Sequence, residues 1–484
     1  MGTAVPTRAD LFVGGQSVEA AGGGRFDTFD PSTGEVVAQI AEATAEDVDR
    51  AVTTAREAFE RSWPSTPPRE RADLLTRAAA AVRANAEELV ELAERTAGLP
   101  TRMAKGDVET SARYLEYYAG IADKLHGETI PLGPDFIDYT EREPWGVCAV
   151  IPPFNVPFQL TARSVAPALA CGNTVVIKPA EQAPIPAIRL AQLITEAGAA
   201  PGMVNVVPGA GPAAGAALVG HPEVSHITFT GSLPTGQAIM RGAAEQLTPV
   251  TLELGGKSPQ IIFPDADLDG AVQAIVSSSL LTAGQVCSAG TRILAHHDIA
   301  DDLRERLLAA VSDISIGPAE DGPDMGPLIS ATQQERVLEA IQAARDDGAR
   351  VLSGGGAPEN GLSGYYIEPT VLGNVSSDMR VAREEVFGPV LALMEFGDEE
   401  AAVGIANDSE YGLVAGVWTR ELGLAHRVAR RVRAGQVFVN NYGAAGGIEL
   451  PFGGYRKSGI GREKGLAALD EYLQVKNVCV QIAE

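Results

Sequence analysis

Residues 145–179 read WGVCAVIPPFNVPFQLTARSVAPALACGNTVVIKP and contain two short β-rich runs, Gly146–Ile151 and Asn173–Lys178. Two more runs of this kind follow, Met203–Val207 and Ser225–Phe229, and stretches with helical periodicity separate them. Strand–helix alternation predicts a mostly parallel sheet with helices on both faces. Ligands of such sheets bind at the carboxyl ends of the strands, so the residues that follow these runs are the first candidates for a site.

The regions on either side of this alternation complete the organisation. A capping signal at Thr44–Asp47 begins a helical region, and long amphipathic helices are expected from Glu70 to about Gly120. A second strand–helix region runs from about Gly255 to Pro451. Two peripheral β-rich ribbons, His126–Glu143 and Tyr472–Ile482, are expected to pair between subunits, because an exposed sheet edge has unmet hydrogen bonds.

The overall composition limits the class of protein. With 484 residues, 45% of them hydrophobic and 21% charged, the chain has an ordinary globular composition and is long enough for two or three domains. Its net charge of −25 repels phosphate backbones and argues against a nucleic-acid partner. No apolar run is long enough for a membrane span, and we expect no signal peptide. The four cysteines have no metal-ligand spacing, so we expect no metal site and a cytoplasmic location: Cys148, Cys171, Cys287 and Cys479.

Cys287 and Glu253 are the pair of side chains with the clearest chemical meaning. Cys287 ends the segment Gly284–Cys287, and Glu253 lies in the segment Leu252–Lys257. A thiolate can attack a carbonyl carbon, and a carboxylate can afterwards activate water. A cysteine taken alone is more often a small buried apolar residue, so the rest of the chain has to support the catalytic interpretation.

Two strand ends carry groups that suit a dinucleotide. The turn Phe229–Gly236 places two glycines five residues apart before an expected helix, where a backbone can approach a phosphate. This spacing is not G-x-G-x-x-G, so a plain strand-to-helix turn is an equal alternative. Lys178 and Glu181 can bind the hydroxyls of an adenosine ribose, and the carboxylate disfavours a 2′-phosphate, which favours NAD over NADP. The alternative for both residues is a solvated surface position.

Eight motifs extend this pattern over nearly the whole chain: Pro144–Val147, Ile151–Pro157, Gly172–Pro179, Phe229–Gly236, Leu252–Lys257, Gly284–Cys287, Glu384–Val390 and Pro451–Glu463. In this order they resemble the NAD(P)-dependent aldehyde dehydrogenase superfamily. The resemblance implies an α/β fold with a Rossmann-type dinucleotide-binding domain, an α/β catalytic domain and a small β oligomerisation arm. The implied boundaries are 1–125 and 145–254, then 255–451, and finally 126–144 with 468–484 for the arm.

The resemblance implies the catalytic roles residue by residue. Cys287 would supply the thiolate that attacks the aldehyde, and the Asn155 amide with the Cys287 N–H would stabilise the oxyanion. After hydride transfer to the nicotinamide, Glu253 would deprotonate the water that hydrolyses the thioester, and burial is expected to raise the pKa of this carboxyl. Glu463 would support the site.

The resemblance also implies the binding residues. NAD, with NADP as an alternative, would contact Ile151, Phe154, Lys178, Glu181, Gly211, Phe229, Gly231, Ser232, Leu254, Glu385 and Phe387. The substrate would contact Val156, Leu160, Arg163 and Tyr442. The glycine-rich segment Tyr442–Leu450 stands where many family members have bulky aromatic residues. This departure leaves small aromatic aldehydes and aliphatic semialdehydes both open as substrates.

Three alternatives accompany this interpretation. Arg163 either binds a substrate carboxylate or, as we favour, pairs with a neighbouring acid. A relative that transfers the acyl group to coenzyme A is disfavoured because Glu253 is present. A catalytically silent paralogue is disfavoured because Cys287, Glu253 and Asn155 are all retained. The expectation is therefore an NAD-dependent enzyme that oxidises an aldehyde to its acid as a homodimer or homotetramer.

Overall fold

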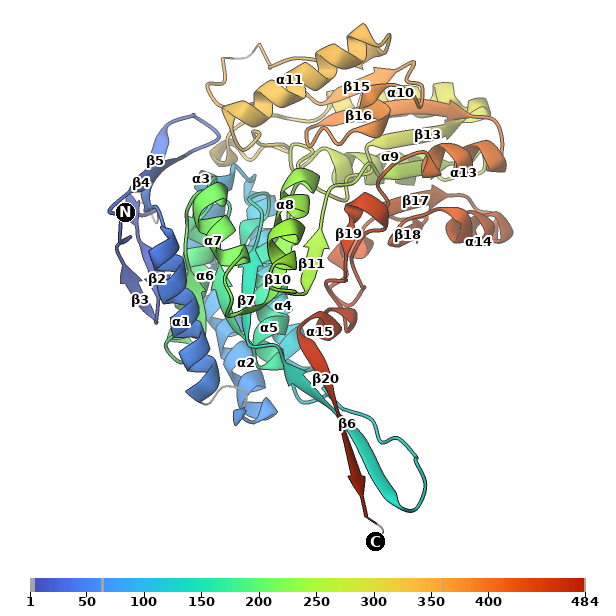
Figure 1. Ribbon diagram of the computed structural model, residues 1–484. Coiled ribbons are helices and arrows are strands. Elements are labelled where there is room, and N and C mark those ends of the chain that lie inside the picture. The colour runs from blue at the N-terminus through green and yellow to red at the C-terminus, as the bar shows by residue number, and fades with distance from the viewer. Residues whose placement is uncertain (1–4, 62–64, 360, 483–484) are drawn as a thin grey trace.

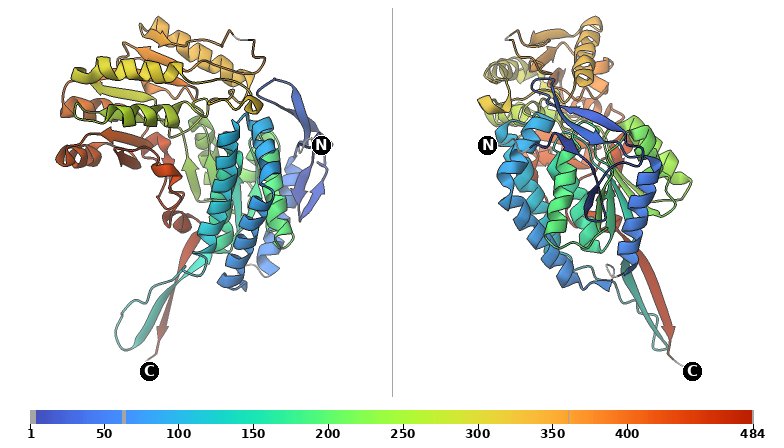
Figure 2. Two further views of the ribbon diagram at one scale, coloured as in Figure 1. Left: turned by 180° about the vertical axis from the view of Figure 1, so that it is seen from behind. Right: turned by 90° about the vertical axis from the view of Figure 1, so that its left-hand side faces the viewer.

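The computed structural model describes residues 5–61, 65–359 and 361–482. Two large sheets, each covered by helices, lie side by side, and a long two-stranded arm projects from the first (Figures 1 and 2). The N-terminal segment adds a three-stranded sheet of β1 (Arg8–Ala9), β5 (Val36–Ala41) and β4 (Arg25–Phe29). Across the described residues, no helix combines the length and apolar character that crossing a membrane requires.

The first sheet has eight strands in the order β19-β11-β10-β7-β8-β9-β2-β3. Its five central strands run parallel: β7 (Val147–Ile151), β8 (Thr174–Ile177), β9 (Val204–Val206), β10 (Val224–Thr230) and β11 (Val250–Glu253). The four β-rich runs of the sequence are thus confirmed as neighbouring strands. Antiparallel strands complete both edges: β2 (Leu11–Val13), β3 (Gln16–Val18) and β19 (Gly459–Ile460).

Side chains alternate between the two faces of the sheet along each strand, and both faces carry apolar residues. Helices therefore cover both faces. Val150 and Ile177 face α2 (Pro68–Ala84), α3 (Ala86–Ala97), α4 (Thr101–Ala119), α5 (Pro157–Cys171) and α6 (Ile185–Glu196). Ala149 and Val176 face the opposite way, toward α1 (Ala45–Arg61), α7 (Ala216–Val219) and α8 (Leu233–Ala244). This arrangement leaves the carboxyl ends of the strands free for a site.

The second sheet has seven strands in the order β14-β15-β16-β13-β12-β17-β18, and only β14 runs antiparallel. The strands are β12 (Pro259–Ile262), β13 (Arg292–His296), β14 (Arg350–Ser353), β15 (Thr370–Gly373), β16 (Val390–Phe396), β17 (Val414–Trp418) and β18 (Gln436–Val439). One face packs on α9 (Leu268–Ser279) and α10 (Ala300–Ser312). The other packs on α11 (Ala331–Asp346), α12 (Arg380–Arg383), α13 (Glu399–Asn407) and α14 (Leu422–Arg431).

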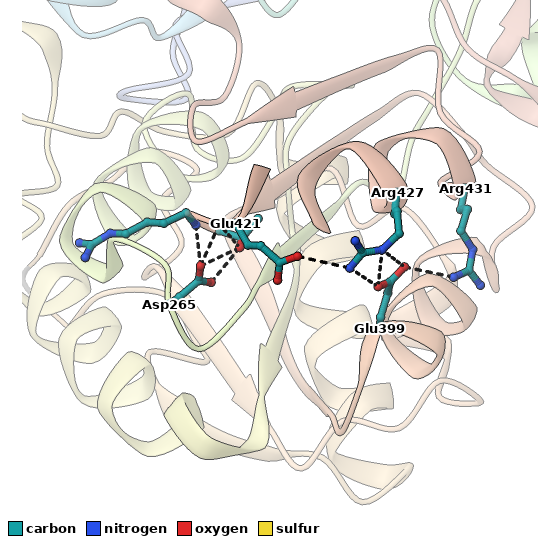
Figure 3. A network of polar contacts seen from close by, with 7 residues as sticks. Asp265, Glu399, Glu421, Arg427 and Arg431 are labelled. Atoms are coloured by element: carbon teal, nitrogen blue, oxygen red, sulfur yellow. Dashed lines mark hydrogen bonds and ion pairs between the residues drawn. The ribbon is translucent and has the colours of Figure 1, made fainter. Parts of the chain in front are cut away.

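Polar contacts fix the connections at one side of this second sheet (Figure 3). Asp265, which follows β12, accepts hydrogen bonds from the Thr419 hydroxyl at 2.8 Å and from the backbone N–H of Glu421 at 3.0 Å. Glu399 accepts hydrogen bonds from Arg427 and Arg431 of α14. The Asp265 carboxylate thereby holds the loop after β17. The exposed ion pairs of Glu399 each contribute at most ~1 kcal/mol to the stability of the fold.

The arm consists of β6 (Phe136–Pro144) and β20 (Leu473–Gln481). The two ribbons were expected to pair between subunits, but they pair antiparallel within one chain over the whole length of both strands. The arm extends away from both sheets in all three views (Figures 1 and 2). The first ribbon was expected from His126, but its strand begins only at Phe136. Pro131 and Pro134 interrupt the segment before it, and proline lacks the N–H that a strand ladder needs.

Candidate active site

A cavity of about 490 Å³ lies where the carboxyl ends of the first sheet meet the second sheet. Eight of the expected site residues line it: Phe154, Asn155, Leu160, Gly231, Ser232, Cys287, Glu385 and Phe387. Their positions are more than 200 residues apart in the sequence at the extremes, so folding is what brings them together. Four polar residues outside the quoted motifs also line the cavity: Gln333, Arg336, Glu339 and Arg380.

Cys287 lies half-buried in the loop between α9 and β13. Gly284, three residues earlier, has a left-handed backbone (φ 68°), and a side chain there would collide with the Gly388 carbonyl. Burial raises the pKa of the Cys287 thiol to about 12, with Arg163 opposing and the acids Glu385 and Glu253 adding to this shift. The raised pKa means that the sulfur has to lose its proton before it can attack.

Asn155 is buried and reaches the loop of the thiol. Its amide nitrogen donates a hydrogen bond to the Gln285 carbonyl at 2.7 Å, two residues before Cys287. An amide nitrogen carries two N–H groups, so one remains for a ligand in the cavity. The amide oxygen accepts no hydrogen bond from the described residues. The side chain thus joins the two halves of the site and keeps a donor available beside the sulfur.

Asp107 holds the helix that follows Asn155, a contact that the sequence analysis did not identify. Helix α5 has no side-chain cap of its own, since Val156 and Pro157 begin it. The buried Asp107 carboxylate on α4 instead accepts the Phe158 N–H at 3.2 Å and the Gln159 N–H at 2.7 Å. Burial raises the pKa of Asp107 to about 7, and both N–H groups limit the rise. The sequence signal that could have revealed this contact is the position of Asp107, an acid on the buried face of an amphipathic helix.

Glu253, at the end of β11, is 1% exposed. Neither of its carboxyl oxygens makes a hydrogen bond with a described residue. Burial raises the pKa of Glu253 well above its usual range, and Glu463 raises it further, while Arg163 and Arg462 oppose the shift. A Cβ at Gly453 would stand 2.9 Å from one of the oxygens, so the glycine leaves the carboxyl its space. The raised pKa makes the ionised carboxylate a stronger base than an exposed glutamate.

Arg163 and Glu463 form a buried ion pair next to these groups. Glu463 also accepts hydrogen bonds from the hydroxyls of Ser164 at 2.9 Å and Thr228 at 3.0 Å. Arg163 donates a further hydrogen bond to the Thr230 hydroxyl at 2.8 Å. The favoured alternative, in which Arg163 pairs with a neighbouring acid, is confirmed, and its positive charge is already matched inside the protein.

At the far end of the strand edge, Lys178 and Glu181 bind each other. The Lys178 ammonium lies 3.0 Å from the Glu181 carboxylate, which also accepts the Gly211 N–H at 2.7 Å. Gly231 differs from expectation in one respect, because its N–H donates to the Glu253 carbonyl at 3.0 Å. The N–H groups available to a phosphate therefore belong to the first turn of α8, which begins after Ser232.

Glu385 and Phe387 reach the cavity from the second sheet. Glu385 accepts the Gly256 N–H at 3.3 Å, and burial raises the pKa of this carboxyl to about 7. Phe387 has a left-handed backbone (φ 52°) and packs edge-on against Phe154, with ring centroids 5.9 Å apart. Gln333 donates to the Phe387 carbonyl at 2.9 Å and so holds this strained segment in place.

Five more of the expected residues do not line the cavity. Ile151, Phe229 and Leu254 belong to the apolar core beneath it, and Val156 packs on the other core. Tyr442 donates its hydroxyl to the Ser288 carbonyl at 2.6 Å and packs near Cys287. Direct contact of these five residues with a cofactor or substrate stays a prediction.

Comparison with known proteins places this geometry in context. A family model described as the aldehyde dehydrogenase family matches residues 18–478. A candidate aldehyde dehydrogenase from Burkholderia cenocepacia is 47% identical, with 98% of this chain and 100% of that chain covered and a TM-score of 0.96. The aldehyde dehydrogenase from Bacillus cereus in complex with NAD⁺ is 42% identical (98% and 97% covered, TM-score 0.96). An NAD-dependent aldehyde dehydrogenase from Sinorhizobium meliloti is 40% identical (100% and 96% covered, TM-score 0.97).

Proposed function

Since the chain belongs to the aldehyde dehydrogenase family, we propose that it oxidises an aldehyde to its carboxylic acid with NAD, through a thioester on Cys287. One observation carries the proposal. The cavity presents a thiol and an amide donor together, and a buried carboxyl without a hydrogen-bond partner lies close enough to raise the pKa of that thiol. These are the nucleophile, oxyanion donor and base that acyl chemistry on a cysteine requires.

The residues at the strand ends fit NAD. The Glu181 carboxylate, with Lys178 beside it, would accept the two ribose hydroxyls of the adenosine half and would repel a 2′-phosphate. The first turn of α8 would receive the pyrophosphate. Glu385 would hold the nicotinamide ribose, with Phe387 against the ring. When bound there, NAD accepts the hydride that the aldehyde carbon loses.

The protein's own groups account for the other steps. The Cys287 thiol releases its proton to water in the cavity, and the thiolate forms a bond to the carbonyl carbon. The resulting oxyanion is held by the free N–H of the Asn155 amide and by the Cys287 backbone N–H. When the C–H bond breaks, the carbonyl re-forms as a thioester. Glu253 then removes a proton from water, the hydroxide attacks, and the sulfur leaves from the carboxylic acid.

Rapid mixing of the enzyme with NAD and an aldehyde tests this sequence by the time course of NADH. We expect steady turnover for the wild type, no NADH for Cys287→Ala, and a burst followed by a stall for Glu253→Gln. Steady turnover by Glu253→Gln would contradict the assignment of the base. Formation of acyl-CoA from added coenzyme A, in place of the free acid, would favour the acyl-transferring alternative.

We further propose that the enzyme acts in the cytoplasm as a homodimer or homotetramer. The arm supports this, because it presents exposed apolar side chains far from either core: Phe136, Ile137, Val475, Val480 and Ile482. A second subunit would cover them and could pair with the outer edge of β20. Replacing Val480 with Glu should shift the mass in light scattering toward the monomer; an unchanged mass would count against the arm.

A further inference from the structure

Lys464 places a cation near the thiol that the proposed mechanism does not use. It follows Glu463 directly and has a left-handed backbone (φ 66°). Its ammonium donates a hydrogen bond to the Gly446 carbonyl at 2.9 Å, in the short helical turn Ala444–Gly446. It also lies 5.6 Å from the centre of the Phe452 ring. The side chain therefore bridges the C-terminal segment and the glycine-rich loop.

The Phe452 ring connects this cation to the reacting sulfur. Phe452 packs with Leu413 and Val414, and Cys287 and Tyr442 pack against the same cluster. The Arg163 guanidinium lies 5.5 Å from the centre of the same ring. Two cations thus contact one aromatic side chain of the thiol's surroundings, and an attraction of this kind is typical of cation–π geometry.

The two cations differ in how their charge is matched. Arg163 is fully engaged by the buried Glu463. Lys464 forms no ion pair with any described carboxylate, and Glu449, the acid that acts on it most, is 58% exposed and pairs with Arg113 at 3.7 Å. Burial and Arg163 lower the pKa of Lys464 to about 8, whereas Glu449, Cys287 and Glu463 act in the opposite direction. Near neutral pH this leaves a mostly charged ammonium without a matching anion.

The glycine-rich loop leaves room beside that ammonium. A Cβ built at Gly443 or at Gly446 would meet no atom within 4 Å. Many family members are expected to fill this region with aromatic side chains, whereas here the space is open. An unmatched cation next to open space near a thiol is suited to the charged end of a substrate.

We propose that Lys464 forms an anion subsite, which selects aldehydes that carry a carboxylate remote from the carbonyl group. The subsite rests on the proposed function and narrows its substrate class. Because Glu463 already matches the charge of Arg163, the substrate carboxylate would bind to Lys464 and not to Arg163. The competing explanation is that the ammonium only braces the loop through the Gly446 carbonyl.

The ratio of kcat/KM for a carboxylated aldehyde to kcat/KM for its neutral counterpart tests the subsite. The pairs are 4-carboxybenzaldehyde with benzaldehyde, and 4-oxobutanoate with butanal, which separate aromatic from aliphatic substrates. We expect the wild type to favour the carboxylated member of at least one pair. Lys464→Met should lower that ratio about tenfold, mainly through KM, as expected for the loss of one charged hydrogen bond. Lys464→Arg should retain most of it.

Two further variants separate the subsite from a structural role. Lys457→Met removes an exposed lysine of the same segment, which pairs with Glu410, and should leave the ratio unchanged. Glu449→Gln removes the competing anion and should raise the ratio. If Lys464 merely braced the loop, Lys464→Met would change both members of a pair equally.

The pH dependence of the ratio gives an independent readout. Because Lys464 loses its charge as the pH rises through about 8, the wild-type preference should fall over this range. Ionisations of Cys287 and Glu253 affect both substrates and cancel in the ratio. A ratio that is independent of pH and of Lys464, with turnover intact, would overturn the subsite alone. Failure of the wild type to form NADH from all four aldehydes would instead overturn the proposed function.

Discussion

The two ends of the proposed site satisfy their polar groups in opposite ways. At the nucleotide end, the Glu181 carboxylate already receives the Lys178 ammonium and the Gly211 N–H. At the thiol end, both oxygens of Glu253 and the amide oxygen of Asn155 are buried and receive no hydrogen bond from the described residues. The chain therefore forms one end as a completed binding surface and leaves the other incomplete.

This contrast has an energetic consequence. A buried polar group without a partner costs ~1–3 kcal/mol relative to a satisfied one. Such a cost persists at positions where a reacting molecule supplies the missing partner, so the thiol end should lose stability in exchange for reactivity. The nucleotide end should show no such exchange, because its side chains stabilise the folded state by their own contacts.

The largest effect on catalysis is expected at the thiol end, where the Asn155 amide would stabilise the oxyanion. Asn155→Ala should lower kcat by a factor of about 10² to 10³, because one preorganised donor is lost in the transition state. KM should change much less, since the donor acts on charge that develops only during reaction. Single-turnover NADH formation measures the effect, with Asn441→Ala, an exposed asparagine of the neighbouring loop, as the control. A loss of less than about tenfold would contradict an oxyanion role.

The second effect tests the stability contrast directly. Glu253→Met should raise the free energy of unfolding by about 1–3 kcal/mol while abolishing thioester hydrolysis, because an unpartnered buried carboxyl is replaced by an apolar side chain. Glu181→Met is the matched variant at the nucleotide end, and it should give no gain because it removes the partner of Lys178. Urea unfolding of both variants gives the comparison. Destabilisation by both variants alike would remove the distinction between the two ends.

A third effect concerns Asp107, which caps the helix behind Asn155. Asp107→Leu should lower the free energy of unfolding by about 1 kcal/mol, because the helix loses its cap. It should also lower kcat about tenfold, because the Asn155 amide would shift from its position. Asp107→Asn retains an acceptor and should recover part of kcat. Equal loss in both variants would indicate that the negative charge, and not the hydrogen bonds, positions the helix.

The ionisation of Asp107 gives this effect a pH dependence of known sign. Burial raises the pKa of Asp107 from its ordinary 3.8 to about 7, so the folded protein binds the proton more tightly than the unfolded chain. The contribution of Asp107 to stability is therefore present at low pH and is lost as the pH rises from about 4 to about 7. Urea unfolding at pH 5 and pH 8 should show wild type losing stability relative to Asp107→Asn.

The sequence predicted the central strands because their signal is local. Val147–Ile151 and Thr174–Ile177 are continuous apolar runs, as expected of strands buried on both faces. The pairing of the edge strands was not predicted, because it depends on distant segments: Phe12 pairs with Val206, and Gly459 pairs with Glu253. Two residues of strand at Gly459–Ile460 carry no periodicity that a sequence can show.

The residues of the candidate site also divide into those with a local sequence signal and those whose contacts depend on the fold. Motifs located Cys287 and Asn155, because these residues lie in short segments with a chemical pattern of their own. The pairing of Arg163 with Glu463 joins residues 300 positions apart, so the sequence could only leave it as one of two alternatives. Lys464 gave no signal, since a lysine is exposed by default and only the fold brings it against Phe452.

The smallest effect is expected at the completed end, where a substitution changes cofactor choice and leaves the chemistry intact. Glu181→Ser removes the carboxylate that would repel a 2′-phosphate and leaves Lys178 free to attract it. The ratio of kcat/KM for NADP to kcat/KM for NAD should rise about tenfold, the factor expected from ~1.4 kcal/mol. The burst of NADH in a single turnover should keep its wild-type rate at saturating NAD. A changed burst rate would mean that the two ends are coupled and that the nucleotide end also positions the reacting groups.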